Sequence, residues 1–383
     1  MKIAMIGHKR VPSRVGGIEV VVGELASRMA ALGHQVTIYN RRVKEPKLRQ
    51  WQDCRVVEVR TFANEKLNAF VYSFFATLRA IAGGYDVLHF HAEGPSCMIA
   101  LAKLFRKRCV STIHGLDWQR AKWGRFASAY LMMGERQAAR RADRLIVLSA
   151  EMSRYFQRTY GRQADFIPNG ITRPQPRPAK VIGEKYGLTA NGYLLFLARL
   201  TPEKGLHYLL EAYRELDTDL PLVVAGGLEP ETPYIKEIRA MAALDPRVKL
   251  TGFVEGAALE ELYANCLLYI LPSDVEGMAM SLLEAVSYGA PCLASDIPEN
   301  QDIAPGLIRY FRRGDVDSLR AELAAVLAAP ALRGQIFDPN LTAEEVCRRR
   351  ETFFQIHDWD EITRRTLELY QEARPKRGEG SVK

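Results

Sequence analysis

The residues best suited to chemistry lie in the segment 271–284, which reads LPSDVEGMAMSLLE. An apolar run ends there, a loop carries Glu276 and Gly277, and an apolar helical pattern begins near Met278. Glu284 lies about 9 Å along the helix from its start near Met278, at about 1.5 Å per helical residue. Two carboxylates on either side of a helix N-terminus can hold the hydroxyl groups at both ends of a nucleotide sugar, and the N–H groups between them can receive its diphosphate. Spacing alone equally allows an ordinary helix with one acidic residue near its start and a solvated glutamate later.

A second segment, 197–205 (LARLTPEKG), carries two cations. Arg199 leaves the end of a predicted strand, and Lys204 lies at the start of the following predicted helix. Arginine binds a diphosphate bidentately and lysine as a point charge. Both can also stabilise a leaving group that departs as a dianion. Taken as isolated residues, the two cations fit a solvated surface better.

A weaker signal lies near the N-terminus. Gly16 and Gly17 precede a helical pattern, so the backbone there can approach a phosphate closely. This is not the GxGxxG fingerprint, and the second strand ends in Asn40, Arg41 and Arg42 with no acidic residue for an adenosine ribose, which argues against a nicotinamide dehydrogenase. The two arginines leave only an NADP-type site open.

The histidines give a similar, weaker signal. His89 and His91 form a His-x-His pair, but no third ligand is placed by the sequence, so we expect buried or hydrogen-bonded rings and no metal site. His114, which ends another strand, is a candidate donor to a sugar hydroxyl or phosphate.

These residues sit between elements that alternate in type. Strands are predicted at 2–6, 35–39, 86–91, 109–114 and 144–149, with a helix at 18–32; after the proline-rich linker 172–181 they recur at 193–198, 221–225, 248–251, 267–271 and 291–294. Strands separated by helices predict two α/β units with parallel sheets, and ligands then sit outside the carboxyl ends of the strands, in the cleft between the units. A last helix is expected at 361–373, before a disordered polar tail.

Length and composition limit the classes of protein to which the chain can belong. The chain has 383 residues, of which 48% are hydrophobic and 26% charged, which excludes a mainly disordered protein and suggests two domains. Six cysteines without metal-ligand spacing indicate a reducing compartment, and we find neither a signal peptide nor a membrane span, since the best candidate, 67–82, is short and contains Arg79. We therefore expect a cytoplasmic protein.

The charge of the chain is uneven. Residues 1–169 hold 28 Lys and Arg against 13 Asp and Glu, a balance of +15, whereas the remainder has a balance of −7. The basic half suits an anionic surface. A nucleic-acid partner is not expected, because interleaved aromatic residues and a known binding module are missing from the sequence.

Taken together, the segments resemble the retaining glycosyltransferases of family 4. GHKRVPSRVGGIEVVVGELASRMAALGHQVTIY is similar to that family's opening, ARLTPEKG to its diphosphate motif, and PSDVEGMAMSLLEAVSYGAPCLASD to its Glu-x7-Glu signature. The resemblance implies the GT-B fold, two Rossmann-like parallel-sheet domains facing across a cleft. Residues 1–170 with the returning helix 358–383 would form the acceptor-side domain, and 171–357 the nucleotide-sugar-binding domain.

The resemblance also implies the activity. A sugar would move with retention from a nucleotide-diphosphate sugar to a glycan or lipid-linked acceptor in surface polysaccharide synthesis, without metal or cofactor. The segment 112–124 (TIHGLDWQRAKWG) is similar to a subgroup associated with rhamnosyl transfer. A nucleotide-sugar epimerase or hydrolase of the same fold, and a non-catalytic sugar-binding protein, remain the alternatives.

Residue roles follow from the same resemblance. Glu276 would touch the donor sugar, Glu284 the ribose, and His114 the sugar from the first domain. The remaining donor-binding residues would be Arg199 and Lys204 on the diphosphate, Gly16 and Gly17 beneath it, Phe253 near the base, and Gly277, Met278, Ala279 and Met280 along the sugar and phosphate. The catalytic set is His114, Glu276, Arg199 and Lys204, with front-side attack by the acceptor hydroxyl.

Two further points concern specificity and location. Ala279 and Ser281 stand where the family often has glycine and proline, and the extra methyl group of Ala279 narrows the sugar pocket. Because family acceptors are often lipid-linked at the inner leaflet, a membrane-facing patch is expected, formed by Lys103, Arg106, Lys107, Arg108, Arg140, Arg141 and Arg144.

Overall fold

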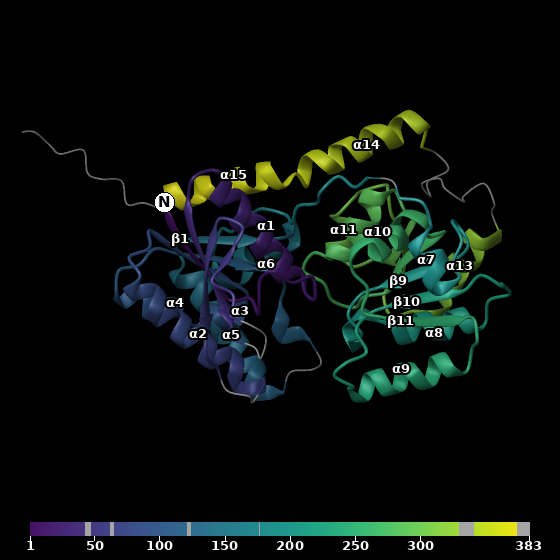
Figure 1. Ribbon diagram of the computed structural model, residues 1–383, viewed down its shortest axis with the longest axis horizontal. Coiled ribbons are helices and arrows are strands. Elements are labelled where there is room, and N and C mark those ends of the chain that lie inside the picture. The colour runs from purple at the N-terminus through teal and green to yellow at the C-terminus, as the bar shows by residue number, and fades with distance from the viewer. Residues whose placement is uncertain (43–46, 62–64, 121–123, 176, 329–340, 374–383) are drawn as a thin grey trace, which may run out of the picture. The chain divides into compact units, whose positions relative to one another are not determined.

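The computed structural model describes residues 1–42, 47–61, 65–120, 124–175, 177–328 and 341–373, which form two compact units (Figure 1). Unit 1 comprises Met1–Gly170 and His357–Lys383, and unit 2 comprises Ile171–Ile356. The tail expected to be disordered lies outside the described residues. Each unit is an α/β layer structure built on one sheet.

Unit 1 is organised around a sheet whose described strands follow the order β3-β4-β2-β1-β5-β6-β7-β8. All neighbours are parallel except β3 and β4. The strands are β1 (Lys2–Ile6), β2 (Gln35–Arg41), β3 (Gln50–Trp51), β4 (Cys54–Val59), β5 (Val87–His91), β6 (Cys109–Ile113), β7 (Arg144–Val147) and β8 (Asp165–Phe166). The central strands are buried along their length, as expected for parallel strands covered on both faces.

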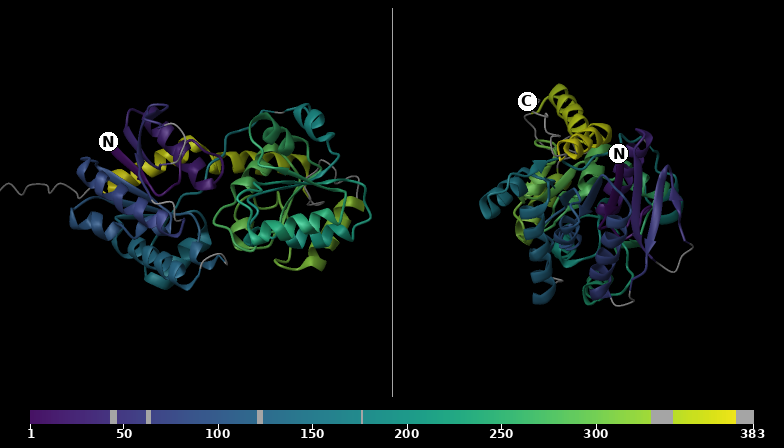
Figure 2. Two further views of the ribbon diagram at one scale, coloured as in Figure 1. Left: turned by 60° about the horizontal axis from the view of Figure 1, so that its bottom comes forward. Right: turned by 90° about the vertical axis from the view of Figure 1, so that its left-hand side faces the viewer.

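The helices of unit 1 cover this sheet. They are α1 (Gly17–Ala31), α2 (Glu65–Ala82), α3 (Glu93–Ser96), α4 (Ile99–Leu104), α5 (Arg125–Arg141), α6 (Ala150–Tyr160) and α15 (Trp359–Glu372), with a 3-10 turn, η1 (Asp117–Gln119). The C-terminal α15 lies beside α1, yellow beside purple in Figures 1 and 2, and Arg28 on α1 pairs with Asp360 at 2.9 Å. Trp359 packs on Gly170, where an added Cβ would lie 2.3 Å from the indole ring.

Unit 2 contains an entirely parallel sheet in the order β11-β10-β9-β12-β13-β14. Its strands are β9 (Leu194–Leu197), β10 (Leu222–Ala225), β11 (Val248–Gly252), β12 (Leu268–Leu271), β13 (Cys292–Ser295) and β14 (Arg309–Phe311). Its helices are α7 (Val181–Tyr186), α8 (Leu206–Arg214), α9 (Pro233–Ala243), α10 (Gly256–Asn265), α11 (Met280–Tyr288), α12 (Pro298–Gln301), α13 (Val316–Ala328) and α14 (Ala343–Ile356), with a 3-10 turn, η2 (Pro202–Lys204).

The expected α/β class with parallel sheets is confirmed. The sequence analysis did not predict β3, β4, β8 and β14. The apolar segment 67–82 forms part of α2, and no helix among the described residues is long and apolar enough to cross a membrane. All six cysteines are free thiols, five of them buried, whereas Cys347 is exposed.

Candidate active site

The strongest candidate site lies at the carboxyl edge of the unit 2 sheet, where β9 and β12 are neighbours. The loop after β9 carries Lys204, in η2, and the loop after β12 carries Glu276. The Lys204 ammonium and the Glu276 carboxylate form an ion pair. Both side chains are nearly enclosed, with 12% and 6% of their surface exposed. Sheet order therefore joins two charges that lie 72 residues apart in the chain.

Backbone contacts fix these two loops against each other. Gly205 has a φ of +68°, and a Cβ there would lie 1.9 Å from the carbonyl oxygen of Pro272, so only glycine fits. The Asp274 N–H donates to the Glu203 carbonyl at 2.9 Å, and the Tyr208 hydroxyl donates to the Asp274 carboxylate at 3.2 Å. Backbone contacts between the two loops therefore hold Lys204 and Glu276 close together, in addition to the attraction of their charges.

The N-terminus of α11 adjoins Glu276. The helix begins at Met280, two residues after the expected start near Met278, because Ala279 is extended and acts as its N-cap without a side-chain hydrogen bond. The first N–H groups of the helix therefore have no side-chain cap and can serve an anion. Glu284, one turn inside α11, accepts a hydrogen bond from the Tyr263 hydroxyl at 3.0 Å.

Other predicted donor-site residues lie on the same edge of the sheet. Arg199 follows β9, is exposed, and forms no side-chain hydrogen bond or ion pair to a described residue. Phe253 follows β11 with 48% of its surface exposed. Gly277 and Met278 are buried in the loop before α11. Arg199, Lys204, Phe253 and Glu276 thus lie along one edge of one unit, with Glu284 just inside the adjoining helix.

Sequence reasoning missed Gly226, which follows β10 between the Arg199 loop and Phe253. A Cβ there would lie 2.4 Å from the Ala198 carbonyl oxygen, and its N–H donates to the Gly252 carbonyl at 2.9 Å. The signal was available, because Gly226 and Gly227 come directly after the apolar run 221–225. Tyr269 was also missed; its hydroxyl donates to Ser281 at 2.8 Å and anchors the start of α11 to β12.

In unit 1, the predicted residues lie at the carboxyl edge of its own sheet. Gly16 is the N-cap of α1 and Gly17 its first residue. A Cβ on Gly16 would lie 2.3 Å from the carboxylate of Glu19, which accepts a hydrogen bond from the Lys9 N–H at 2.8 Å. His114 follows β6, and its Nε2 lies 3.1 Å from His91 Nδ1.

Burial keeps two histidines of unit 1 neutral. It lowers the pKa of His114 to about 3 and that of His89 to about 3. His89 is hydrogen-bonded to Tyr370 at 2.6 Å and to Thr112 at 2.7 Å, which agrees with the hydrogen-bonded role expected from the sequence. Within the described residues, no group of three or more potential ligands is arranged to hold a metal ion.

Comparison with known proteins decides the family. Residues 15–173 match the model "Glycosyltransferase Family 4", and residues 183–336 match "Glycosyl transferases group 1". The chain belongs to glycosyltransferase family 4. Residues 121–123 of the segment similar to rhamnosyltransferases lie outside the described residues.

Individual relatives of this glycosyltransferase are distant in sequence. The α-maltose-1-phosphate synthase of Mycolicibacterium smegmatis is 27% identical over 62% of this chain, and the match spans 65% of that protein. The sucrose-phosphate synthase of Thermosynechococcus elongatus has a TM-score of 0.83 at 21% identity, with 97% of this chain and 98% of that one covered. HepE of Anabaena, solved with UDP-glucose, has a TM-score of 0.77 at 18% identity, with 97% and 100% covered. The structures establish the GT-B type of fold.

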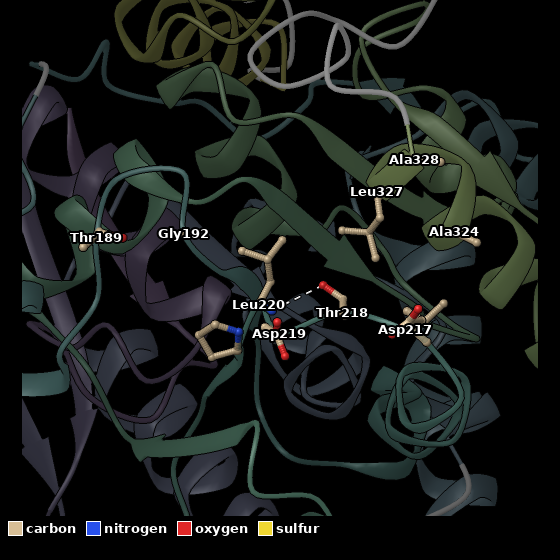
Figure 3. A pocket seen from close by; sticks show the side chains of 11 residues that line it. Thr189, Gly192, Asp217, Thr218, Asp219, Leu220, Ala324, Leu327 and Ala328 are labelled. Carbon is tan, nitrogen blue, oxygen red and sulfur yellow. Dashed lines mark hydrogen bonds between the residues drawn. The ribbon is translucent and has the colours of Figure 1, made fainter.

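A separate depression of 650 Å³ in unit 2 lies away from the candidate site of the glycosyltransferase (Figure 3). Its lining includes Thr189 and Gly192, just before β9, and Asp217 and Asp219, just before β10. These residues mark the amino ends of the strands, whereas ligands of parallel sheets bind at the carboxyl ends. The depression is therefore not the active site.

Proposed function

We propose that this family 4 enzyme transfers a sugar, with retention, from a nucleotide-diphosphate sugar to a glycan or lipid-linked acceptor in surface polysaccharide synthesis. Unit 2 would bind the donor and unit 1 the acceptor. The observation that carries the proposal is the enclosed Lys204–Glu276 pair at the carboxyl edge of unit 2, beside the uncapped start of α11. It would provide a cation for the diphosphate and a carboxylate for the sugar hydroxyls, a few residues from N–H groups without a side-chain cap.

In the proposed reaction, the bond between the anomeric carbon and the diphosphate oxygen breaks while the acceptor oxygen bonds to the same face of that carbon. The acceptor proton passes to the departing diphosphate oxygen, so atoms and charge balance. Arg199, Lys204 and the N-terminus of α11 offset the charge that develops on the diphosphate. Neutral His114, in unit 1, would hydrogen-bond a sugar hydroxyl, and Gly16 and Gly17 would lie beneath the diphosphate.

The remaining donor contacts follow from the edge of the sheet. Phe253, half exposed after β11, would stack on the base, and Glu284 would hold the ribose hydroxyls. The backbone from Gly277 to Met280 would line the sugar and phosphate. The methyl group of Ala279, which is buried, would reduce the room for the sugar and would favour a 6-deoxyhexose such as rhamnose over a hexose.

The test is a binding and turnover panel on the full chain. UDP-, GDP- and dTDP-linked sugars are screened by thermal shift, because a ligand at 100 times its Kd stabilises the folded state by about 2.7 kcal/mol. We expect one nucleotide class to raise the Tm of the wild type and of a Lys236→Met control, which alters an exposed lysine of α9, and to raise that of Arg199→Gln by less at the same donor concentration. An unshifted Tm with every donor in the wild type would refute the proposal.

Turnover separates the alternatives. A glycosyltransferase releases nucleotide in proportion to added acceptor. Release at full rate without an acceptor would instead identify an epimerase or hydrolase of the same fold. Donor binding without any release in the presence of lipid-linked and glycan acceptors would identify a sugar-binding protein.

We also propose that unit 1 binds the cytoplasmic face of an anionic membrane. Leu104, at the end of α4, is 77% exposed, and Phe105 follows it between basic residues. Phe126, Met132 and Met133 are exposed on α5, which contacts α4. Apolar side chains beside basic ones suit an interface rich in anionic lipid.

The expected basic patch needs one correction before it is tested. Lys103 pairs with Asp143 at 2.5 Å, and Arg144 pairs with Glu372, so these two cations are partly neutralised. The test is co-sedimentation with vesicles containing phosphatidylglycerol. Leu104→Ser/Phe105→Ser should lower the bound fraction, as should removal of the anionic lipid. Sedimentation that ignores both changes would contradict membrane binding.

A further inference from the structure

Arg41 in unit 1 is a partly buried cation that forms no ion pair with an acidic residue among those the structure describes. It is the last residue of β2, at the carboxyl edge of the sheet, and its guanidinium carbon lies 5.0 Å from the centre of the Tyr72 ring. Its Nε is buried and has no hydrogen-bond partner. The side chain forms no ion pair with any acidic residue that the structure describes.

The groups around Arg41 are few and already engaged. Tyr72 is fully buried; its hydroxyl donates to the Tyr39 carbonyl and accepts from the Gly7 N–H. Glu19 is the acidic group that attracts Arg41 at longer range, but its carboxylate accepts a hydrogen bond from the Lys9 N–H. The other titratable groups close enough to influence Arg41 are His8, which burial keeps neutral, and Tyr130.

Burial at this site works against the positive charge. It lowers the pKa of Arg41, although a guanidinium stays protonated in proteins. A partly buried charge that lacks a close partner destabilises a fold, and such charges are normally paired. The cation–π contact with Tyr72 compensates for only a part of this cost. Stacking on the ring also holds the guanidinium in one orientation.

The loop next to Arg41 contributes further positive groups at the carboxyl edge of the unit 1 sheet. The Arg41 N–H donates to the Lys9 carbonyl at 2.7 Å, so the residue adjoins the loop between β1 and α1. Lys9 and Arg42 are exposed there. α1 begins directly after this loop, with Gly16 as an N-cap that offers no side-chain acceptor. A fixed guanidinium near such a loop is suited to bidentate binding of an oxyanion.

We propose that Arg41 binds an anionic group, phosphate or carboxylate, on the sugar acceptor. The inference rests on the proposed function, in which unit 1 binds the acceptor. It adds the chemical class of that acceptor. The donor diphosphate is the other anion of the reaction, and its charge is matched in unit 2 by Arg199 and Lys204. A neutral acceptor would leave the guanidinium without a partner.

The test uses full-length protein saturated with the nucleotide identified by thermal shift, so that the donor site is occupied. Three probes are titrated calorimetrically: glucose 1-phosphate, glucuronate and neutral methyl α-glucoside. We expect at least one anionic probe to bind the wild type, and Arg41→Gln to weaken it 10-fold or more. Arg41→Lys should lose less affinity, and the neighbouring exposed control Arg42→Gln should stay within 2-fold.

One further titration identifies the source of the anion. Tighter binding of farnesyl diphosphate than of glucose 1-phosphate assigns the group to a lipid carrier, and the reverse order assigns it to a phosphorylated sugar. Equal affinity of Arg41→Gln and wild type for the anionic probes would overturn the inference, as would failure of both anionic probes to bind the wild type.

A second measurement needs no variant. Phenylglyoxal modifies accessible arginines, and peptide mass spectrometry can follow Arg41 and Arg42 separately. The bound anionic probe should protect Arg41 at least 5-fold and leave Arg42 unchanged; equal labelling of Arg41 with and without probe contradicts the inference. Nucleotide affinity is measured in the same titrations. If nucleotide binds and Arg41→Gln has no effect, only this inference fails, whereas absence of nucleotide binding defeats the proposed function itself.

Discussion

Replacing Lys204 with methionine tests both roles of the pair with Glu276. The Glu276 side chain is only 6% exposed, so the variant leaves a carboxylate buried without its cation. Breaking a buried ion pair from one side costs about 3–5 kcal/mol. For a unit of this size, each kcal/mol lowers Tm by about 2–4 °C, so the unit 2 transition should fall by roughly 6–20 °C.

The double variant Lys204→Met/Glu276→Gln separates stability from catalysis. Because glutamine carries no charge, most of the lost stability should return. The cation for the leaving diphosphate is still missing, so turnover should stay low. Loss of one preorganised donor at a developing oxyanion costs about 10²–10³ in kcat, and we expect a fall of that order in both variants.

The assay combines thermal denaturation with nucleotide release at saturating donor, measured well below the lowest Tm. Lys236→Met, whose side chain is 68% exposed, should match the wild type in both measurements. Wild-type turnover in Lys204→Met would refute the catalytic role of the lysine. A double variant that regains turnover together with stability would show that the lysine acts only as a counter-ion to Glu276.

Three further predictions address other parts of the molecule. Arg199→Gln should raise KM for the donor about 10-fold without changing Tm, because its exposed side chain contacts no described partner; an altered Tm would contradict this placement. Phe253→Ala should weaken nucleotide binding by about 1–3 kcal/mol if the ring stacks on the base, as measured by calorimetry, and unchanged affinity would exclude stacking. Burial lowers the pKa of His114 to about 3 and holds that of His91 well below its usual value, so between about pH 6.5 and 3 the unfolded chain binds protons that the folded unit does not. Stability should therefore fall on acidification by up to about 1.4 kcal/mol per pH unit for each ring, and His91→Gln should reduce that slope in urea unfolding at pH 7, 6 and 5.

The central strands could be predicted from sequence because both their faces are buried. Lys2–Ile6 is reproduced in full, and the apolar runs that form β5, β6 and β9 are placed within a residue or two. β4 was missed because Arg55 and Glu58 interrupt its apolar residues. β14 was missed because it lies at the sheet edge and spans only Arg309–Phe311. Such segments become strands only when a neighbouring strand supplies hydrogen bonds.

The candidate site was predictable as a set of motifs but not as an arrangement. Lys204 and Glu276 were both identified, yet nothing in either motif says that they pair. Their contact depends on β9 and β12 being neighbours, although β10 and β11 intervene in the sequence. In the sequence, Arg41 bears only on a dinucleotide site, where an arginine would suit the 2′-phosphate of NADP, because its partial burial depends on Tyr72, more than thirty residues away.

The pairing also bears on the order in which the two cations act on a donor. Lys204 and Glu276 neutralise each other in an enclosed site, so together they exert little attraction on an approaching diphosphate. Arg199 is exposed and retains its full charge, and it adjoins the same loop. Under the proposed function, Arg199 should therefore act in donor association, whereas Lys204 would become available only once the sugar hydroxyls compete for Glu276. Binding of the sugar and neutralisation of the leaving group would then be coupled, because the carboxylate released to the sugar would free the ammonium for the diphosphate. That coupling explains why substitution of Arg199 should act on KM and substitution of Lys204 on kcat.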